Sequence, residues 1–158
     1  MKSPLRPFLA VLMIVLLASC SSMGERISPP SASIQQLAVQ ASGDWEVDLR
    51  LHNYSSVSMR FDSLKLELGV DENAAGTLQA APAISIGPTS ADVVRIVFKP
   101  EGMARIAVAD ALASRRPLSY RLQGAVQATP DKASKPREFK IDSRNSLSPA
   151  PGLDGVLR

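Results

Sequence analysis

Apolar and polar residues alternate with a period of two along much of the middle of this chain. Within residues 44–53 the apolar positions are Trp45, Val47, Leu49 and Leu51, and the polar positions between them are Glu46, Asp48, Arg50 and His52. Successive side chains of a β-strand point to opposite faces of its sheet, whereas a helix repeats about every 3.6 residues. The alternation therefore predicts a strand that buries one face, including Trp45, and exposes the other face to water.

The same alternation continues over residues 57–70, but its phase changes between Phe61 and Leu64. An extra residue in a strand shifts the alternation in this way, so the phase change predicts a β-bulge or a change of sheet. Shorter stretches of the same kind, bounded by turn-forming residues, predict five more strands. These cover residues 77–81, 84–86, 92–99, 118–129 and 137–142, with residues 130–136 as a charged hairpin loop.

One stretch, residues 103–114, has helical spacing instead. It follows Pro100 and Glu101 and precedes Arg115 and Arg116, and charges of these signs suit the start and the end of a helix. The residues expected on its apolar face are Met103, Ile106, Ala107, Ala111 and Leu112. About seven strands with one short helix predict an all-β fold, an antiparallel β-sandwich, because a parallel sheet would need several helices between its strands.

The first twenty residues have the organisation of a bacterial export signal. Residues 1–7 contain two basic residues and no acid, and residues 8–17 are an unbroken apolar run. This run has the length found in secretory signal peptides and about half the length that a membrane-spanning helix needs. It leads into Leu17-Ala18-Ser19-Cys20, which resembles the lipobox of bacterial lipoproteins. The resemblance implies a signal peptide over residues 1–19, recognised through Leu17, Ala18 and Ser19, and lipidation of Cys20 as the first mature residue.

Cys20 is the sole cysteine of the chain, so without lipid it would be an unpaired thiol in an oxidising compartment. The alternatives are an ordinary signal peptide that leaves this free thiol, or an uncleaved N-terminal anchor. Two or three acyl chains hold a protein stably on a membrane, whereas a single chain holds it only weakly. The residue after Cys20 is Ser21, not the aspartate that retains many lipoproteins in the inner membrane. We therefore expect anchoring in the outer membrane, facing the periplasm.

Composition divides the remaining 139 residues into one domain between two tails. Residues 20–33 are small and polar with two prolines, and we expect them to form a lipidated tether. Residues 148–158 are rich in proline and glycine, and we expect a flexible tail. The folded domain is therefore predicted over residues 34–147. Loss of the signal peptide leaves 16 basic and 15 acidic residues, and without a cluster of basic and aromatic residues we expect no nucleic-acid partner.

The sequence contains little that points to catalysis or metal binding. His52 is the sole histidine, and the nearest acid on the same strand face, Asp48, is four residues away, or about 13 Å at ~3.3 Å per residue. Asp71, Glu72 and Asp92 lack the spacing of a calcium-binding loop. Motifs for phosphate binding or for an activated nucleophile are also missing. We therefore expect no enzyme activity, no catalytic residue, no metal and no cofactor, with His52 on the solvated surface.

Several of these stretches together resemble the type 2 late embryogenesis abundant proteins, also described as the water stress and hypersensitive response domain. The most specific stretch is Leu118-Ser119-Tyr120-Arg121-Leu122-Gln123-Gly124, which is similar to the Leu-x-Tyr-x-Leu-x-Gly strand of that family. Further similar positions are the strand 45–51 with Asn53 after it, residues 61–68, the turn 86–90, Phe139 and Leu147. The chain departs from the family at Tyr54-Ser55, where the family commonly has Pro-Asn, and at Asn145, near a glycine of the family.

The resemblance covers most of the predicted domain and implies an immunoglobulin-like β-sandwich with one helix. It also implies, more loosely, a non-catalytic role in protecting the envelope or its proteins under desiccation or osmotic stress. The alternative is a lipid- or protein-binding module, such as an accessory subunit of an envelope assembly. Such a module would hold an acyl chain between its two sheets, or it would bind a partner strand at the edge of a sheet. Arg115 and Arg116 are expected to be cations at a helix C-terminus, with contact to lipid phosphate as the alternative. The expected partners are the membrane, through Cys20, and lipid or envelope proteins.

Overall fold

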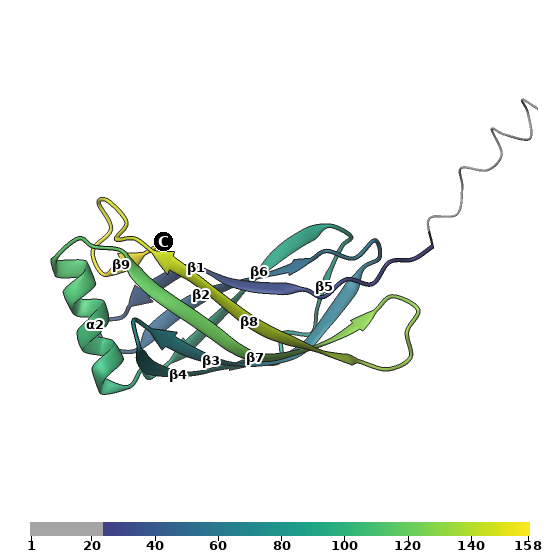
Figure 1. Ribbon diagram of the computed structural model, residues 1–158, viewed down its shortest axis with the longest axis horizontal. Helices are drawn as coiled ribbons and strands as arrows, with labels where there is room; N and C mark the ends of the chain where they lie inside the picture. The colour runs from purple at the N-terminus through teal and green to yellow at the C-terminus, as the bar shows by residue number, and fades with distance from the viewer. Residues whose placement is uncertain (1–23) are drawn as a thin grey trace, which may run out of the picture.

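The computed structural model describes residues 24–158 of the chain, and two antiparallel sheets face each other in it (Figure 1). The first sheet has the strand order β6, β2, β1, β9, in which β1 is Ser31–Val39, β2 is Trp45–Asn53, β6 is Ser90–Phe98 and β9 is Val156–Leu157. The second has the order β4, β3, β7, β8, in which β3 is Met59–Val70, β4 is Asn73–Ala80, β7 is Leu118–Pro130 and β8 is Arg137–Leu147. A short strand, β5 (Ile84–Ile86), pairs with the first residues of β3, and the helix α2 is Gly102–Ala113.

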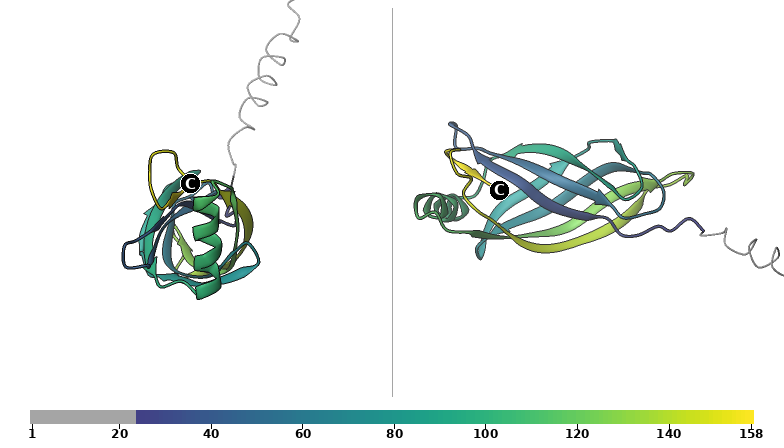
Figure 2. Two further views of the ribbon diagram at one scale, coloured as in Figure 1. Left: turned by 90° about the vertical axis from the view of Figure 1, so that its left-hand side faces the viewer. Right: turned by 90° about the horizontal axis from the view of Figure 1, so that it is seen from above.

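This architecture confirms the predicted all-β sandwich with one short helix. The inward positions of β2 are all at most 1% exposed, namely Trp45, Val47, Leu49 and Leu51, as the alternation predicts. The helix lies across one end of the sandwich, as the end-on view in Figure 2 shows. Burial of one face of every long strand against the opposite sheet supplies the main stabilisation of the fold.

The phase change after Phe61 is a β-bulge in β3, as predicted. Phe61 pairs with Ala128 of β7, and Ser63 pairs with Gln127, so Asp62 is the extra residue. Asp62 accepts a hydrogen bond of 2.6 Å from Thr129 and pairs with Arg60 at 2.7 Å. The bond from Thr129, and after it the contacts with Arg60, lower the pKa of the Asp62 carboxyl because they favour its charged form.

Each named residue of the Leu-x-Tyr-x-Leu-x-Gly stretch in β7 has a structural role that explains its type. Leu118 and Leu122 are fully buried. The Tyr120 hydroxyl accepts a hydrogen bond of 3.0 Å from the Ile34 amide in the opposite sheet, which joins the two sheets through the core. Gly124 has φ +152°, and a Cβ at this position would overlap the backbone oxygen of Lys65 in β3, so a side chain at residue 124 would push the two strands apart.

The apolar face of the helix agrees with the predicted one in part. Ala111 is buried and Ala107 and Leu112 pack against the core, as predicted. Ala104 and Val108 also face the core, whereas Met103 and Ile106 are each 63% exposed. The end of the sandwich beneath the helix is already filled by large side chains, including Trp45 and Phe98, whose rings meet edge to face at 5.8 Å. Little room is left between the helix and this filled end, so the first turn contacts the core through the small residue Ala104, while Met103 and Ile106 point outward.

The C-terminal segment also differs from the predicted flexible tail. Leu157 is fully buried, and β9 pairs with β1 through Leu37 to Leu157 and Ala38 to Val156. Ser148 and Arg158 exchange two backbone hydrogen bonds, of 2.6 and 2.8 Å. The proline and glycine residues therefore form an ordered loop between these two positions. The sequence pattern missed β9 because two residues are too short to show an alternation.

Candidate functional site at the proximal end of the sandwich

The sandwich has two different ends (Figure 1). At the proximal end the described chain begins, and this end consists of residues 24–30, the β2–β3 turn (54–58), residues 81–89 and the β7–β8 hairpin loop (131–136). At the opposite end, the helix end, α2 covers the core. The predicted lipidation residue Cys20 and the recognition residues Leu17, Ala18 and Ser19 lie outside the described residues. The proximal end is the part of the domain that follows them directly along the chain.

A buried asparagine holds the proximal end together. The side-chain nitrogen of Asn53 donates to the carbonyl oxygens of Val57, Ile86 and Gly87 at 2.8–3.0 Å. Its side-chain oxygen accepts a hydrogen bond of 2.9 Å from the Ser55 amide. Because Asn53 ends β2 in one sheet and Ile86 ends β5 in the other, a single fully buried side chain joins the two sheets. No motif in the sequence marks Asn53 for this role, although Asn53 continues the inward positions of β2 as a polar residue.

The first described residues are bound to this end by hydrogen bonds. The Arg26 amide donates to Ser56 Oγ at 2.8 Å, and the Ser56 amide donates to the Arg26 carbonyl at 3.0 Å. The Ser28 amide donates to the buried Ser55 Oγ at 2.9 Å. Glu25 pairs with Lys132 of the β7–β8 hairpin loop at 2.7 Å, and this contact raises the pKa of Lys132. Residues 25–28 therefore run along the folded domain, fixed to two of its loops.

These contacts correct the predicted tether over residues 20–33. From Glu25 onward the chain is attached to the domain, Pro30 is buried, and β1 begins at Ser31. The prediction failed because proline and small polar residues are typical both of free linkers and of extended segments that bind neighbouring backbone groups. The part of the predicted tether that precedes these attachments is only residues 20–24.

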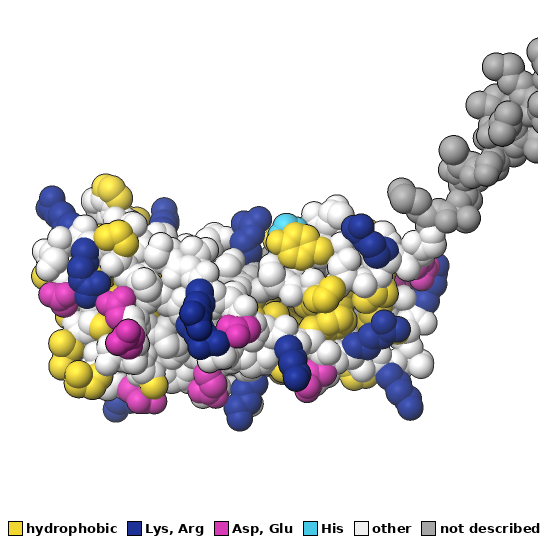
Figure 3. Space-filling view, in the orientation of Figure 1, with side chains coloured by type: hydrophobic (Ala, Val, Ile, Leu, Met, Phe, Trp, Pro, Cys, Tyr) yellow, Lys and Arg dark blue, Asp and Glu magenta, His cyan; other side chains and the backbone are white. Residues whose placement is uncertain are grey.

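The hairpin loop beside the first described residues is basic. The stretch 131–137 reads Asp-Lys-Ala-Ser-Lys-Pro-Arg, with three cations and one carboxylate. Among the described residues, Lys135 and Arg137 have no carboxylate within ion-pair distance, and both are exposed. Figure 3 shows basic side chains at this end of the molecule, close to the point where the described chain begins. The next residue, Glu138, is hydrogen-bonded to Gln127.

The predicted solvated histidine lies at the edge of this end. The rings of His52 and Tyr54 stack with centroids 4.0 Å apart, and Tyr54 is 44% exposed. Asp48 does not meet His52 but accepts two hydrogen bonds from Arg95 on β6, at 2.8 and 3.2 Å. Asp48, and after it Glu46, raise the pKa of Arg95. The structure thus does not bring His52 and Asp48 together as an acid–base pair.

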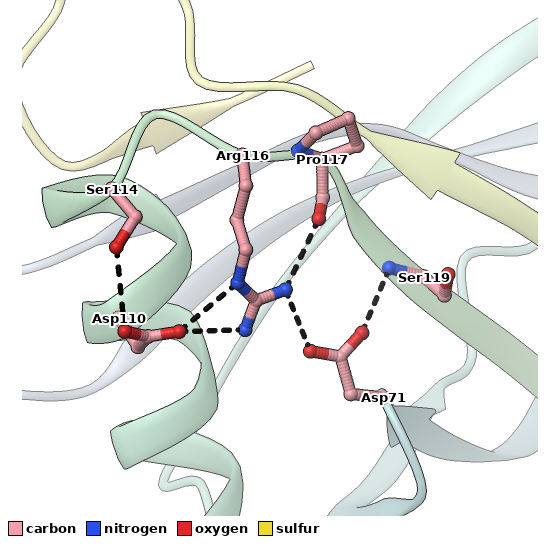
Figure 4. Close-up of polar contacts among 6 residues, drawn as sticks. All are labelled: Asp71, Asp110, Ser114, Arg116, Pro117 and Ser119. Atoms are coloured by element: carbon pink, nitrogen blue, oxygen red, sulfur yellow. Dashed lines mark hydrogen bonds and ion pairs between the residues drawn. The ribbon is translucent and has the colours of Figure 1, made fainter.

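Arg116 belongs to a polar cluster at the helix end (Figure 4). Its guanidinium lies 2.9 Å from Asp110 of α2 and 3.0 Å from Asp71 of the β3–β4 turn. The hydrogen bonds to these two carboxylates, with Asp110 the larger cause, raise the pKa of Arg116. Asp71 also accepts a hydrogen bond of 3.1 Å from the Ser119 amide of β7. The cluster fastens the end of the helix to both neighbouring strands, and it occupies the guanidinium that was considered for lipid phosphate.

Two of the three acids whose spacing does not suit a calcium-binding loop, Asp71 and Asp92, bind different partners in different sheets. Asp71 binds Arg116 and the Ser119 amide, whereas Asp92 lies on β6 in the other sheet and accepts from the Val93 amide. Within residues 24–158 the structure contains no cluster of three or more His, Cys, Asp or Glu side chains arranged to hold a metal ion. Nor does this part of the chain contain a helix of the length and apolarity required to cross a membrane.

Apolar side chains are exposed at the helix end, and sequence analysis did not predict them. Met103 and Ile106 of α2 are joined by Val39 at the end of β1, 37% exposed, and by Leu153 in the C-terminal loop, 45% exposed. A shallow hollow between α2 and the β1–β2 turn is lined by Val39, Arg105 and Ile106, among others. Figure 3 shows apolar side chains at this end of the molecule. The space between the sheets, by contrast, is occupied by the contiguous buried side chains of the core.

No protein-family model matches the chain, and no curated protein matches it. Several solved structures are similar to it. One, described as a late embryogenesis abundant protein, is 13% identical, with 90% of this chain and 80% of that one covered and a TM-score of 0.47. A protein from Arabidopsis thaliana is 12% identical, with 85% and 87% covered and a TM-score of 0.47. A protein from Archaeoglobus fulgidus is 10% identical, with 79% and 98% covered and a TM-score of 0.43.

Proposed function

We propose that this chain is a lipoprotein of the bacterial cell envelope, anchored through lipid on Cys20. The observation that carries the proposal is Leu17-Ala18-Ser19-Cys20 directly after a basic start and a ten-residue apolar run. A thioether-linked diacylglycerol with a further acyl chain on the amine would anchor the domain stably. Ser21 after the cysteine favours the outer membrane, with the domain in the periplasm.

The domain itself is proposed to be non-catalytic and to protect the envelope or its proteins under desiccation or osmotic stress. This proposal is supported by the resemblance of its strand motifs to the type 2 late embryogenesis abundant family. It is also supported by the use of its polar groups within the fold, since Asp48, Asp71 and Asp110 all have arginine partners. A hydrated, charged surface close to the membrane would limit contact between partly unfolded neighbouring proteins as water is lost.

Mass spectrometry of the full-length protein purified from membranes tests the anchor. A mature chain that begins at Cys20 and carries two or three acyl chains is expected, and Cys20→Ser should leave residues 1–19 uncleaved and the protein without lipid. An unmodified Cys20 in the purified protein would refute the anchor. The protective role predicts that a deletion strain survives drying and osmotic shock less well than its parent, and equal survival would refute that role.

A protein-binding module is the second candidate, and the exposed apolar residues of the helix end favour it. Exposed contiguous apolar side chains commonly mark interaction surfaces. Ile106→Lys would disrupt such a surface without touching the core, because Ile106 is 63% exposed. If this candidate is right, a protein that co-purifies with the wild type in stoichiometric amount is lost from the Ile106→Lys variant. The version in which an acyl chain lies between the sheets is not supported, because core side chains occupy that space.

A further inference from the structure

The chain between Cys20 and the first attached residue is short. Lys132 binds Glu25, and Ser56 binds the backbone of Arg26, so six residue steps at most separate Cys20 from a point fixed to the domain. A fully extended chain covers at most about 3.6 Å per residue, so these six steps span at most about 22 Å. A lipid on Cys20 would therefore hold the attached residues 25 and 26 within about 22 Å of the membrane, and the β2–β3 turn and the β7–β8 hairpin loop lie beside these residues.

The helix end is much farther away. β7 runs from the helix end to the hairpin loop and has 13 residues. At ~3.3 Å per residue the strand is about 40 Å long. The chain between the lipid and the domain is thus about half as long as the domain itself. A domain that stands on its proximal end therefore holds its helix end about 40 Å farther from the membrane than its hairpin loop.

The surface that this geometry places nearest the membrane is basic. The hairpin stretch 131–137 has three cations and one carboxylate, and Glu25 already neutralises one of those cations, Lys132. Lys135 on the loop and Arg137 at the start of β8 remain exposed, as described above. Tyr54, whose ring is partly exposed at the same end, is of a residue type that is enriched at membrane–water interfaces.

We propose that the proximal end is a membrane-contact surface, in which Lys135 and Arg137 of the β7–β8 hairpin bind the phosphate groups of anionic phospholipid while the helix end points away. The inference rests on the proposed lipid at Cys20 and goes beyond it, since it assigns the domain one orientation and a lipid-binding loop. Attraction to an anionic surface extends over about a Debye length, roughly 8 Å at physiological salt. Attachment of residues 25–28 to the same loops favours such contact.

The test uses the mature lipidated protein in vesicles that contain a phospholipid with a nitroxide on its headgroup. Cys20 is the sole cysteine and its sulfur would be blocked by lipid, so an introduced cysteine can be labelled selectively with a fluorophore. Ser134→Cys places the label on the hairpin loop, and Ala113→Cys places it on an exposed position of α2. We expect strong quenching of the label at residue 134 and little quenching at residue 113. Equal quenching, or stronger quenching at residue 113, would overturn the proposed orientation.

The contribution of charge is tested by Lys135→Gln with Arg137→Gln in the Ser134→Cys background. In vesicles with phosphatidylglycerol, each cation removed near an anionic surface is expected to lower the ratio of contacting to free loop about fivefold. The matched control is Lys99→Gln with Arg115→Gln, which removes two exposed cations from the helix end and should not change quenching. Quenching that is the same for both pairs of substitutions, or the same in neutral phosphatidylcholine vesicles, would overturn the phosphate contact.

The mass of the reconstituted protein shows whether a negative result contradicts the orientation of the domain or the lipid anchor itself. If Cys20 is lipidated and the quenching pattern is absent, the proposed orientation is wrong and the lipid anchor stands. If the mass shows an unmodified Cys20, the anchor is wrong and the orientation falls with it.

Discussion

Replacement of Asn53 by alanine is expected to destabilise the domain by about 3 kcal/mol. The side chain of Asn53 is fully buried and contacts three carbonyl oxygens and one amide. Its two N–H hydrogens and its oxygen amount to three full hydrogen bonds, one hydrogen being shared between two acceptors. Each such bond is worth about 0.5–1.5 kcal/mol net, which gives roughly 2–4 kcal/mol for the side chain. Because the groups left behind belong to both sheets, the loss should affect the whole fold.

Urea unfolding followed by the fluorescence of Trp45 measures this effect. Trp45 is buried at the helix end, far along β2 from Asn53, so its signal reports global unfolding. The midpoint should fall at an unchanged slope, and the Tm should fall by about 10 °C. Asn73→Ala is the control, since the structure gives Asn73 no side-chain hydrogen bond among the described residues and only partial burial. A loss below 1 kcal/mol for Asn53→Ala, or one equal to that of Asn73→Ala, would refute the assignment.

Three other substitutions test the remaining contacts. Gly124→Ala should lower the free energy of unfolding by at least ~3 kcal/mol, because its Cβ would overlap a backbone oxygen. The control is Gly102→Ala, which has open space around it and should change the Tm by only a degree or two. Tyr120→Phe should cost about 1–3 kcal/mol at pH 7 in urea unfolding, since it leaves the buried Ile34 amide without an acceptor. Burial raises the pKa of Tyr120, so the stability due to its neutral form is complete below the ordinary pKa of ~10 and is lost as the pH rises through the folded-state pKa. The difference in unfolding free energy between the wild type and Tyr120→Phe should therefore become smaller above pH 10. A difference that stays constant with pH would contradict this reasoning. Arg116→Gln should speed hydrogen exchange of the α2 amides more than that of β7. Equal exchange in both elements would show that the cluster does not fasten the helix.

Most strands could be predicted from the sequence because they have one face in the core and one in water. β2 shows a clean alternation for this reason, and the bulge at Asp62 appears as a shift of the same pattern. The alternation did not predict β1, whose register shifts between Ile34 and Gln36 and whose first residues were assigned to the tether. β9 could not be predicted, since its two residues are held only by pairing with β1. The contact face of α2 could be predicted only in part, because the volume left at the end of the sandwich, rather than the apolarity of each residue, selects Ala104 over Met103.

The polar contacts of the proximal end were beyond sequence analysis for a related reason. Asn53 and Ser55 bind backbone groups that come from residues 28, 86 and 87. Contacts between segments so distant along the chain leave no periodic signal. An amide at the last inward position of an apolar strand is the one local sign, because a buried polar group needs partners and implies that neighbouring backbone converges there.

Because residues 25–28 are attached to the domain, the two candidate functions belong to opposite ends of the sandwich. A free tether over residues 20–33 would let any face of the domain reach the membrane. With the chain attached from residues 25–26, a lipid on Cys20 would keep the proximal end near the surface, and in the proposed orientation Ile106 and the rest of the apolar helix end would point away from the membrane. Protection of the membrane would then depend on the charged hairpin loop, and capture of a partner protein would depend on the helix end. A substitution at one end that leaves the other end intact therefore decides which function the chain performs, since the two surfaces share no residue.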